Sequence, residues 1–599
     1  MRLAITTAAF ALLLAMPSAA QDTATDAATA AASPTGNYDE LCDTKPRDPA
    51  EAWAAMRRGT MLEWGSTYVR YPKHRLPDAT DGSKLRLKAW RGERVSAQAV
   101  LWTKDGLDNA TVTPGRLKGR KGELPSASVT AGFVRYVMTD ELNKDGKGGC
   151  GFRPDKTQWD SLLVADAIDV GRSLDIEPCS TRPLWLSVRV PHDAAAGTYD
   201  GKLTVRDGNG KEVSLSYSIE VLDHTLTAPS DWHLDVDLWQ NPYAVARFYG
   251  VQLWSNAHFD AMRPIMKMLA DAGQQSVTAS IMHKPWNGQT YDHFDSMVGK
   301  TLLLDGKWQY DYTVFDRWVT FMMDECGIDG RINCYTMIPW DLSFDYYDQA
   351  TARVKFVKAA PGDEAYKEYW TDFLRDFSDH LREKGWFDKT YISMDERPLE
   401  AMTEAIKVIK TADPEYKIAL AGNYHEEIQE DLDYLSIPYG QEYPHEVLEQ
   451  RRQRGQISAY YTCCTEAFPN IFTFSPPAEA AWTALHAVAG DYDGFLRWAT
   501  MSWPANPLQD SRFHTWAAGD TYCIYPGPMS SLRLENLLQG LQDCEKIHLL
   551  RQELQAQGRV EQLAELEDAL SAFTPEGMAA NGLSTEEAVR AIHDLLNKL

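Results

Sequence analysis

The spacing of apolar and polar positions changes near residue 229 and divides the chain into two parts. After this point, short apolar or aromatic runs alternate with segments whose apolar residues recur every three or four positions. The runs predict buried strands, and the periodic segments predict amphipathic helices. We predict strands at 232–239, 275–283, 331–338, 390–394, 417–421, 434–437, 457–462 and 494–498. Helices are expected at 258–272, 314–326, 366–384, 400–411, 444–454, 478–489 and 531–550. This alternation predicts a parallel sheet, and eight such units predict a (β/α)8 TIM barrel of the α/β class.

The first part of the chain has strand-like runs and no long helical pattern. The clearest hairpin joins 203–205 to 213–221 through the turn-forming residues 207–210. Positions 213, 215, 217, 219 and 221 are all apolar or aromatic, and this strict period of two buries one face of a strand. We therefore predict a β-sandwich at 38–228, the barrel at 229–550 and a charged helical segment at 551–599. Packing beside the barrel is the expected role of the sandwich, and carbohydrate binding is the alternative.

Residues 1–20 have the pattern of a secretory signal peptide. Arg2 precedes an apolar run at 8–16, and Ser18-Ala-Ala20 provides the small residues of a cleavage site. That run is shorter than the roughly 20 apolar residues that span a bilayer, and no later run is long enough. Residues 21–37 lack apolar anchors and predict a disordered leader. No cysteine follows the cleavage site, so we expect a secreted or periplasmic protein without a lipid anchor or membrane span.

Charge and cysteine content restrict the classes of partner and cofactor. A formal net charge of −25 argues against nucleic acid as a partner, because phosphate binding requires a basic surface. The nine cysteines form neither a C-x-x-C motif nor a regular zinc spacing, so we assign no metal and no cofactor. Cys150 and Cys179 are candidates for a disulfide, with buried free thiols as the equal alternative.

Two adjacent carboxylates, Asp395 and Glu396, stand where the fourth predicted barrel strand ends. Pro398 blocks further regular pairing, so the backbone is expected to turn there. Taken alone, such a pair is most simply an acidic surface turn. However, polar and aromatic residues follow several other predicted strands: Trp239, His283, Trp286, Asn287, Trp340, Asp341, Asn423, Tyr461 and Trp498. The ends of barrel strands meet at one face, where active sites lie. Aromatic rings with carboxylates and amides at that face suit a sugar ligand.

Two stretches of sequence make this site more specific. One is Met394-Asp-Glu-Arg-Pro398 on the fourth strand. The other is the C-terminal series Phe495-Leu-Arg-Trp498, Gly519-Asp-Thr-Tyr522, Tyr525-Pro-Gly527, Ser531-Leu-Arg-Leu-Glu535 and Gly540-Leu-Gln-Asp543. Together they resemble glycoside hydrolase family 123, the β-N-acetylgalactosaminidases, over about 232–550. Cys544 departs from the aromatic residue expected there, which concerns helix packing rather than chemistry.

The resemblance implies a retaining, substrate-assisted glycosidase, in which the substrate's own 2-acetamido oxygen attacks the anomeric carbon. Asp395 would orient the acetamido N–H, and Glu396 would protonate the leaving oxygen and then activate water. An adjacent pair is too close to flank the scissile bond, but it suits a nucleophile that belongs to the substrate. Ionised Asp395 is expected to raise the pKa of Glu396. Tyr461 and Asn423 are candidates to bond the acetamido oxygen.

The expected partner is therefore a glycan or glycoconjugate with a terminal β-linked N-acetylhexosamine, N-acetylgalactosamine in the first place. Two alternatives stay open. One is a β-hexosaminidase or other exo-glycosidase with a different sugar specificity. The other is a non-catalytic carbohydrate-binding barrel, against which the intact carboxylate pair argues. The sequence does not determine the oligomeric state.

Overall fold

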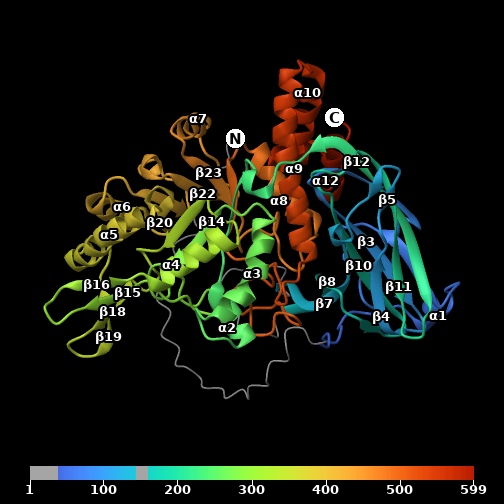
Figure 1. Ribbon diagram of the computed structural model, residues 1–599, viewed down its shortest axis with the longest axis horizontal. Helices are drawn as coiled ribbons and strands as arrows, with labels where there is room; N and C mark the ends of the chain where they lie inside the picture. Colours follow the sequence, from blue (N-terminus) through green and yellow to red (C-terminus); the bar gives the residue numbers. More distant parts are fainter. Residues whose placement is uncertain (1–37, 144–158) are drawn as a thin grey trace, which may run out of the picture.

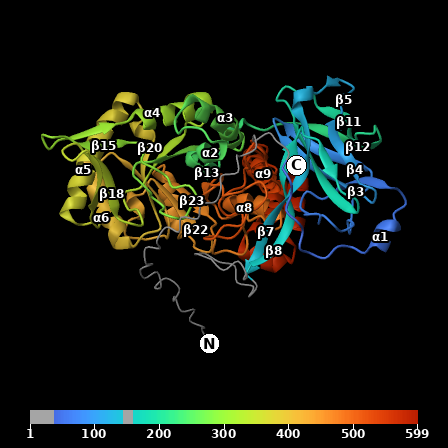
Figure 2. The same cartoon turned by 90° about the horizontal axis from the view of Figure 1, so that it is seen from below.

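The computed structural model describes residues 38–143 and 159–599. The predicted signal peptide, the predicted leader and Cys150 lie outside these residues. A sheet-rich N-terminal region and a barrel lie side by side, and long C-terminal helices stand between them (Figure 1). The same order is visible from below (Figure 2).

Within the described residues, eight parallel strands form the barrel. They are β13 (Asp235–Leu238), β14 (Ser276–Ser280), β17 (Arg331–Tyr335), β20 (Thr390–Asp395), β21 (Lys417–Ala421), β22 (Tyr434–Pro438), β23 (Ile457–Tyr461) and β24 (Gly494–Arg497). They pair in the order β13-β24-β23-β22-β21-β20-β17-β14. The two ends of this order meet where Val236 bridges Gln274, and the Gln275 N–H donates to the Val236 carbonyl at 2.9 Å. The sheet is thus nearly closed, which confirms the predicted (β/α)8 barrel.

The barrel interior contains charged groups that are paired with one another. Every residue of β14 and β17 is buried, as expected for parallel strands covered on both faces. At the N-terminal ends of the strands, Arg331 donates to Asp235 at 2.7 Å and Asn333 donates to Asp237 at 3.0 Å. These contacts satisfy groups whose unpaired burial would cost several kcal/mol. The charged groups in this part of the barrel are therefore satisfied within the protein.

The helices that follow the barrel strands agree with the predicted segments in most cases. They are α2 (Pro242–Tyr249), α3 (Asn256–Ala270), α4 (Thr313–Thr320), α5 (Glu364–Lys384), α6 (Leu399–Ala412), α7 (His445–Gln453), α8 (Ala478–Ala489) and α9 (Leu532–Ala556). The short helix α2 was not predicted. Asn241 caps its N-terminus, because the Asn241 side chain accepts hydrogen bonds from the N–H groups of Tyr243 and Ala244. Between β21 and β22 the described chain forms a 3-10 turn at Gln429–Asp431, so one repeat has no α-helix.

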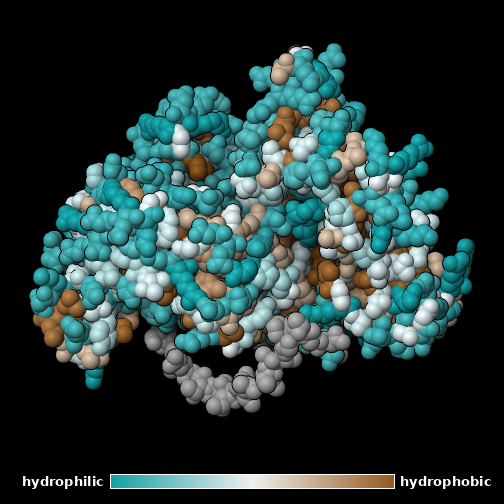
Figure 3. All heavy atoms as spheres, viewed as in Figure 1, coloured by the Kyte–Doolittle hydropathy of each residue, from teal (hydrophilic) through white to brown (hydrophobic). Residues whose placement is uncertain are grey.

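A small sheet inserted into the barrel was also not predicted. It consists of β15 (Gly299–Leu302), β16 (Trp308–Asp311), β18 (Ser343–Asp348) and β19 (Arg353–Lys358), in the order β16-β15-β18-β19. It carries exposed apolar side chains at Leu304, Tyr347, Val354 and Phe356. Figure 3 shows apolar surface over this sheet, at the lower left of the molecule.

The N-terminal region is a sandwich of two sheets, as predicted. One sheet has the order β1-β3-β10-β7-β8 and the other β2-β12-β11-β4-β9, with β5 and β6 at the side of β11. The strands are β1 (Thr60–Gly65), β2 (Lys84–Arg91), β3 (Arg94–Thr103), β4 (Leu107–Pro114), β5 (Lys118–Gly119), β6 (Gly122–Glu123), β7 (Val129–Asn143), β8 (Trp159–Val170), β9 (Leu174–Ile176), β10 (Ser180–Arg189), β11 (Gly197–Arg206) and β12 (Glu212–Thr225). A short helix, α1 (Ala50–Ala54), precedes them. β11 and β12 form the predicted hairpin, with Val205 opposite Val213.

Buried ion pairs join the sandwich to the barrel. Asp166 on β8 accepts hydrogen bonds from Arg70 at 2.9 Å, from Arg533 at 3.0 Å and from the Tyr525 hydroxyl at 2.6 Å. Burial alone would raise the pKa of Asp166, but Arg533 and Arg70 hold it below its ordinary value. The carboxylate is therefore a stabilising charge in the folded protein.

The last helices are α10 (Val560–Leu570), α11 (Pro575–Asn581) and α12 (Thr585–Leu596). Leu566 of α10, Ile592 of α12 and Phe573 of the 3-10 turn Ser571–Phe573 belong to the same apolar core as the barrel. Among the described residues, no helix combines the length and apolar character needed to cross a membrane.

The predicted disulfide between Cys150 and Cys179 is wrong, because Cys179 is a free thiol. Cys464 is disulfide-bonded. Cys544, the departure from the family pattern, is buried between α9 and α8 and its thiol donates to the Ala484 carbonyl at 3.2 Å.

Candidate active site

An open cavity of about 100 Å³ lies at the C-terminal ends of the barrel strands. We call it the barrel cavity. Its lining consists of Trp239, Trp286, Gln289, Trp340, Asp395, Glu396, Ala421, Tyr461, Cys463, Cys464, Leu496, Trp498, Trp516 and Asp520. Both carboxylates of the predicted pair and five of the predicted aromatic residues thus meet in one place.

The two carboxylates reach the same cavity because the strand ends between them. Asp395 is the last residue of β20 and is buried, whereas Glu396 is the first residue after the strand and is exposed. Within a continuous strand, neighbouring side chains would point to opposite faces. The end of the strand at Asp395 removes that constraint.

Burial dominates the electrostatics of Asp395. It raises the pKa of Asp395 to about 6, and the neighbouring charge of Glu396 acts in the same direction. Arg397, whose guanidinium lies 3.1 Å from Oδ1, and the Trp286 indole N–H oppose the rise. This raised pKa of Asp395 was not predicted, and it arises because Asp395 is the more enclosed of the two acids.

Arg397 holds the acid pair in place. Its Nε donates to the Ile338 carbonyl at 2.8 Å and its NH1 donates to the Glu396 carbonyl at 2.6 Å. Its guanidinium lies over the Trp340 ring at 4.0 Å from the ring centroid, a cation–π contact. One arginine thus connects the loop after β17, the acid pair and Trp340, which is 43% exposed at the cavity mouth.

Tyr461 fixes Glu396. Its hydroxyl donates to Glu396 Oε1 from the end of β23. Burial, together with this carboxylate, raises the pKa of Tyr461 well above its ordinary value, so the phenol keeps its proton. Tyr461, predicted to bond the substrate's acetamido oxygen, is therefore in contact with the acid itself.

Aromatic side chains form two further walls of the barrel cavity. Trp239 and Trp286 lie with ring centroids 5.2 Å apart, and both contact Tyr335 beneath them. On another side, Trp498 and Trp516 meet edge to face at 5.8 Å. The Trp516 indole donates to the Gln289 carbonyl at 2.8 Å, which connects two loops across the opening. Such walls suit the apolar faces of a sugar ring.

Four predicted site residues lie outside the lining. His283 contacts Asp295 at 3.0 Å, and Asn287, with φ of 48°, helps the chain turn after Trp286. Asn423 is exposed and its side chain accepts from Gln441 at 2.7 Å.

The fourth predicted site residue outside the lining is Asp341, which is exposed and follows Trp340 in the chain.

Several lining residues were not predicted, and the loop that carries Trp516 and Asp520 supplies two of them. This loop lies between β24 and α9. Trp516 and Asp520 therefore come 19 and 23 residues after Arg497, the last residue of β24. The sequence connects Gly519-Asp-Thr-Tyr522 to the site only through the family resemblance. Cys463 and Cys464 follow β23 after one intervening residue, Thr462, but their spacing suggests no chemistry.

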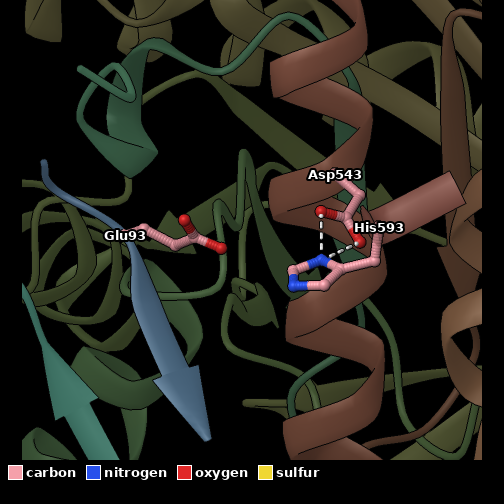
Figure 4. Close-up of side chains that lie close together, drawn as sticks. All are labelled: Glu93, Asp543 and His593. Atoms are coloured by element: carbon pink, nitrogen blue, oxygen red, sulfur yellow. Dashed lines mark hydrogen bonds and ion pairs between the residues drawn. The ribbon is translucent and has the colours of Figure 1, made fainter. Parts of the chain in front are cut away.

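One group of side chains outside the barrel cavity has the residue types of a metal site. Glu93, Asp543 and His593 approach one another between the sandwich, α9 and α12 (Figure 4). The ammonium of Lys546 lies 2.7 Å from Glu93 and 3.7 Å from Asp543, and it balances their charge. The lysine occupies the place that a cation would take, so we interpret the group as an internal ion-pair network.

Comparisons with known proteins agree with this geometry. The model of the glycoside hydrolase 123 catalytic domain matches residues 239–550, and that of the glycoside hydrolase 123 N-terminal domain matches residues 64–207. No curated protein matches the chain.

Among solved structures, the chain is similar to a family 123 glycoside hydrolase from Clostridium perfringens, whose structure was described for glycolipid glycan hydrolysis. The TM-score is 0.80 at 25% identity, covering 90% of this chain and 98% of that chain. A Bacteroides ovatus GH5 xyloglucanase in complex with a heptasaccharide also matches, at 10% identity over 80% of this chain and 100% of that one, but its TM-score of 0.27 supports no conclusion.

Proposed function

The chain belongs to glycoside hydrolase family 123, and from that premise we propose that it is an exported, retaining β-N-acetylgalactosaminidase that uses substrate-assisted catalysis. The observation that carries the proposal is the adjacency of Asp395 and Glu396 in one cavity. Retaining glycosidases with a protein nucleophile hold their two carboxyl groups on either side of the scissile bond, about 5 Å apart. Neighbouring residues at a strand end suit a different arrangement, in which the nucleophile is part of the sugar.

In the first step, the 2-acetamido oxygen attacks the anomeric carbon. The carboxylic acid of Glu396 gives its proton to the glycosidic oxygen, and the bond between that oxygen and the anomeric carbon breaks. Asp395, as the carboxylate, accepts a hydrogen bond from the acetamido N–H. It also stabilises the positive charge that develops on the resulting oxazoline ring. In the second step, Glu396 takes a proton from water, which opens the ring from the opposite face and restores the β configuration.

The geometry supports this division of roles. Asp395 is enclosed, and with a pKa of about 6 it is ionised at neutral pH, as its role requires. Glu396 is exposed at the cavity and can meet both the leaving group and incoming water. Tyr461 bonds one of its oxygens, which leaves the other oxygen for proton transfer.

The substrate we propose is a glycan or glycoconjugate that ends in β-linked N-acetylgalactosamine. The clostridial relative was described for glycolipid glycan hydrolysis, so glycolipid glycans are the first natural substrates to test. The apolar run at 8–16 and the small residues at 18–20 support export to the periplasm or medium.

Aryl glycosides test the proposal directly. Wild-type protein should release aryl alcohol from the β-N-acetylgalactosaminide, and NMR of the first product should show the β anomer. Glu396→Gln should lose most turnover of substrates with poor leaving groups, and Asp395→Ala should lose it broadly. A thiazoline analogue of the intermediate should inhibit. Wild-type rates in either variant, or no inhibition, would refute the assignment.

The same assay separates the alternatives. Preference for the β-N-acetylglucosaminide or for a non-acetylated hexoside would indicate another exo-glycosidase. Sugar binding without release of product would indicate a non-catalytic barrel.

A further inference from the structure

We propose that Asp520 is a specificity-determining residue that accepts hydrogen bonds from hydroxyl groups at the C4–C6 end of the bound sugar. Asp520 lines the barrel cavity, yet its side chain is only 1% exposed. Its Oδ1 accepts from Arg497 at 2.6 Å. Its Oδ2 is buried and accepts no hydrogen bond of good geometry from the described residues; besides Arg497, the Trp498 indole is the side-chain donor that acts on this carboxyl. A buried carboxylate oxygen of this kind is costly unless something satisfies it, and a ligand hydroxyl is a suitable donor.

The position of Asp520 across the barrel indicates which part of the sugar it faces. Asp520 is bound to Arg497, the last residue of β24, while Asp395 ends β20. In the closed order of strands, β20 and β24 are four positions apart in both directions, so they lie on opposite sides of the opening. The anomeric carbon and acetamido group must lie at Asp395 and Glu396 for reaction. The opposite edge of a pyranose carries C4 and the C6 hydroxymethyl group, and this edge faces Asp520.

The surroundings of Asp520 hold it rigidly. Arg497 is buried, donates to both the backbone and side chain of Asp520, and reaches Asn470 at 3.1 Å. Gly519 has φ of +81°, and a Cβ there would lie 2.7 Å from Thr473, so glycine is required to bring the next residue into place. A carboxylate held in this way does not shift to follow the ligand. It therefore binds only a hydroxyl group that the sugar places within hydrogen-bond distance.

The neighbours of Asp520 fit the same interpretation. Trp498 and Trp516 line the cavity beside it, so one wall offers both ring faces and an anionic acceptor. Burial raises the pKa of Asp520, while Arg497 and the Trp498 indole oppose the rise. Because hydroxyl groups at C4 and C6 are donors that a charged oxygen binds strongly, the site should reject sugars that lack them or place them elsewhere.

Deoxy substrates test this role, which rests on the proposed function. We would measure kcat/KM for 4-nitrophenyl β-N-acetylgalactosaminide and its 4-deoxy and 6-deoxy analogues. Wild-type protein should lose about 10- to 100-fold on at least one analogue, as expected for a hydrogen bond to a charged group. Asp520→Asn should lower kcat/KM for the parent substrate. In this variant, kcat/KM for the parent and for each deoxy analogue should differ by less than about threefold.

Asp237→Asn provides a matched control. Asp237 is also a buried barrel aspartate paired with an arginine, but it does not line the cavity. This variant should keep the wild-type ratio between parent and deoxy substrates, whatever its absolute rate. A wild-type ratio in Asp520→Asn would overturn the proposal, because a merely structural role affects all substrates equally.

A binding measurement separates this proposal from the proposed function. Calorimetric titration with N-acetylgalactosamine and its deoxy analogues requires no turnover. Wild-type protein without turnover would refute the catalytic function. The role of Asp520 would still be supported if that protein bound a deoxy sugar more weakly than N-acetylgalactosamine and if Asp520→Asn bound both sugars equally. Equal affinities for all the sugars, or no binding, would overturn the role of Asp520.

Discussion

Replacing Asp395 by asparagine should stabilise the folded protein at neutral pH while it removes activity. Burial raises the pKa of this carboxyl from 3.8 to about 6. Each pKa unit corresponds to about 1.4 kcal/mol, so the fold favours the neutral form by about 3 kcal/mol. Asparagine has nearly the shape of the neutral acid and avoids that penalty. For an unfolding entropy of about 2 cal/mol/K per residue, the melting temperature should rise by about 2.5 °C if the chain unfolds as one unit.

The pH dependence of this effect has a definite sign. Because the folded pKa lies above the unfolded one, the carboxylate destabilises the fold fully above about pH 6 and not at all below the unfolded pKa. The advantage of Asp395→Asn should therefore be largest at pH 7.5 and should fall to roughly a fifth of that value near pH 4. Thermal unfolding followed by circular dichroism at both pH values measures it.

Asp166→Asn is the matched control with the opposite sign. Arg533 and Arg70 hold the pKa of Asp166 below its ordinary value, so loss of its charge should destabilise the protein at neutral pH. The reasoning would be refuted if Asp395→Asn were no more stable than wild type at pH 7.5. It would also fail if the stabilisation were the same at both pH values.

Three further predictions follow from individual contacts. kcat/KM should fall on the acid side with an apparent pKa near 6, because Asp395 must be ionised to orient the acetamido group; a profile that is flat between pH 5 and 7 would contradict this role. Tyr461→Phe should lower kcat by about 10- to 100-fold with little change in KM, since it removes the bond to Glu396; an unchanged kcat would show that the bond has no catalytic role. Although burial opposes the charge of His593, Asp543 holds its pKa above its ordinary value, so its contribution to stability should be full below about pH 6.5 and lost as pH rises through the folded pKa. The melting temperatures of wild type and His593→Gln should therefore converge at alkaline pH, and a constant difference would count against a protonated histidine.

The barrel was predictable because buried parallel strands have a strong local pattern. The predicted strand at 417–421 and helix at 478–489 have the boundaries of β21 and α8. The inserted sheet was missed for a physical reason. Its short strands expose Val354 and Phe356 to solvent, so they lack the continuous apolar run of a core strand.

The candidate site was most predictable where a residue ends a strand or directly follows one. Asp395, Glu396 and Tyr461 meet that condition, and all three line the barrel cavity. Asp520 does not, because the long loop after β24 returns it to the strand end through tertiary contacts with Arg497.

Burial adds an effect that the local pattern does not specify. From the sequence, ionised Asp395 is expected to raise the pKa of Glu396. In the structure, Asp395 is enclosed and Glu396 is exposed, so desolvation acts mainly on Asp395. The degree of enclosure depends on Trp286, Arg397 and the cavity walls, which no local spacing specifies.

The most direct test of the central claim changes the nucleophile itself. Aryl β-galactosaminides carrying acetyl, fluoroacetyl, difluoroacetyl and trifluoroacetyl groups on the 2-nitrogen differ in the electron density of the attacking oxygen. If that oxygen attacks the anomeric carbon beside Asp395 and Glu396, kcat/KM should fall steeply with each fluorine. Rates that do not change across the series, together with a covalent glycosyl-protein found by mass spectrometry, would contradict the account.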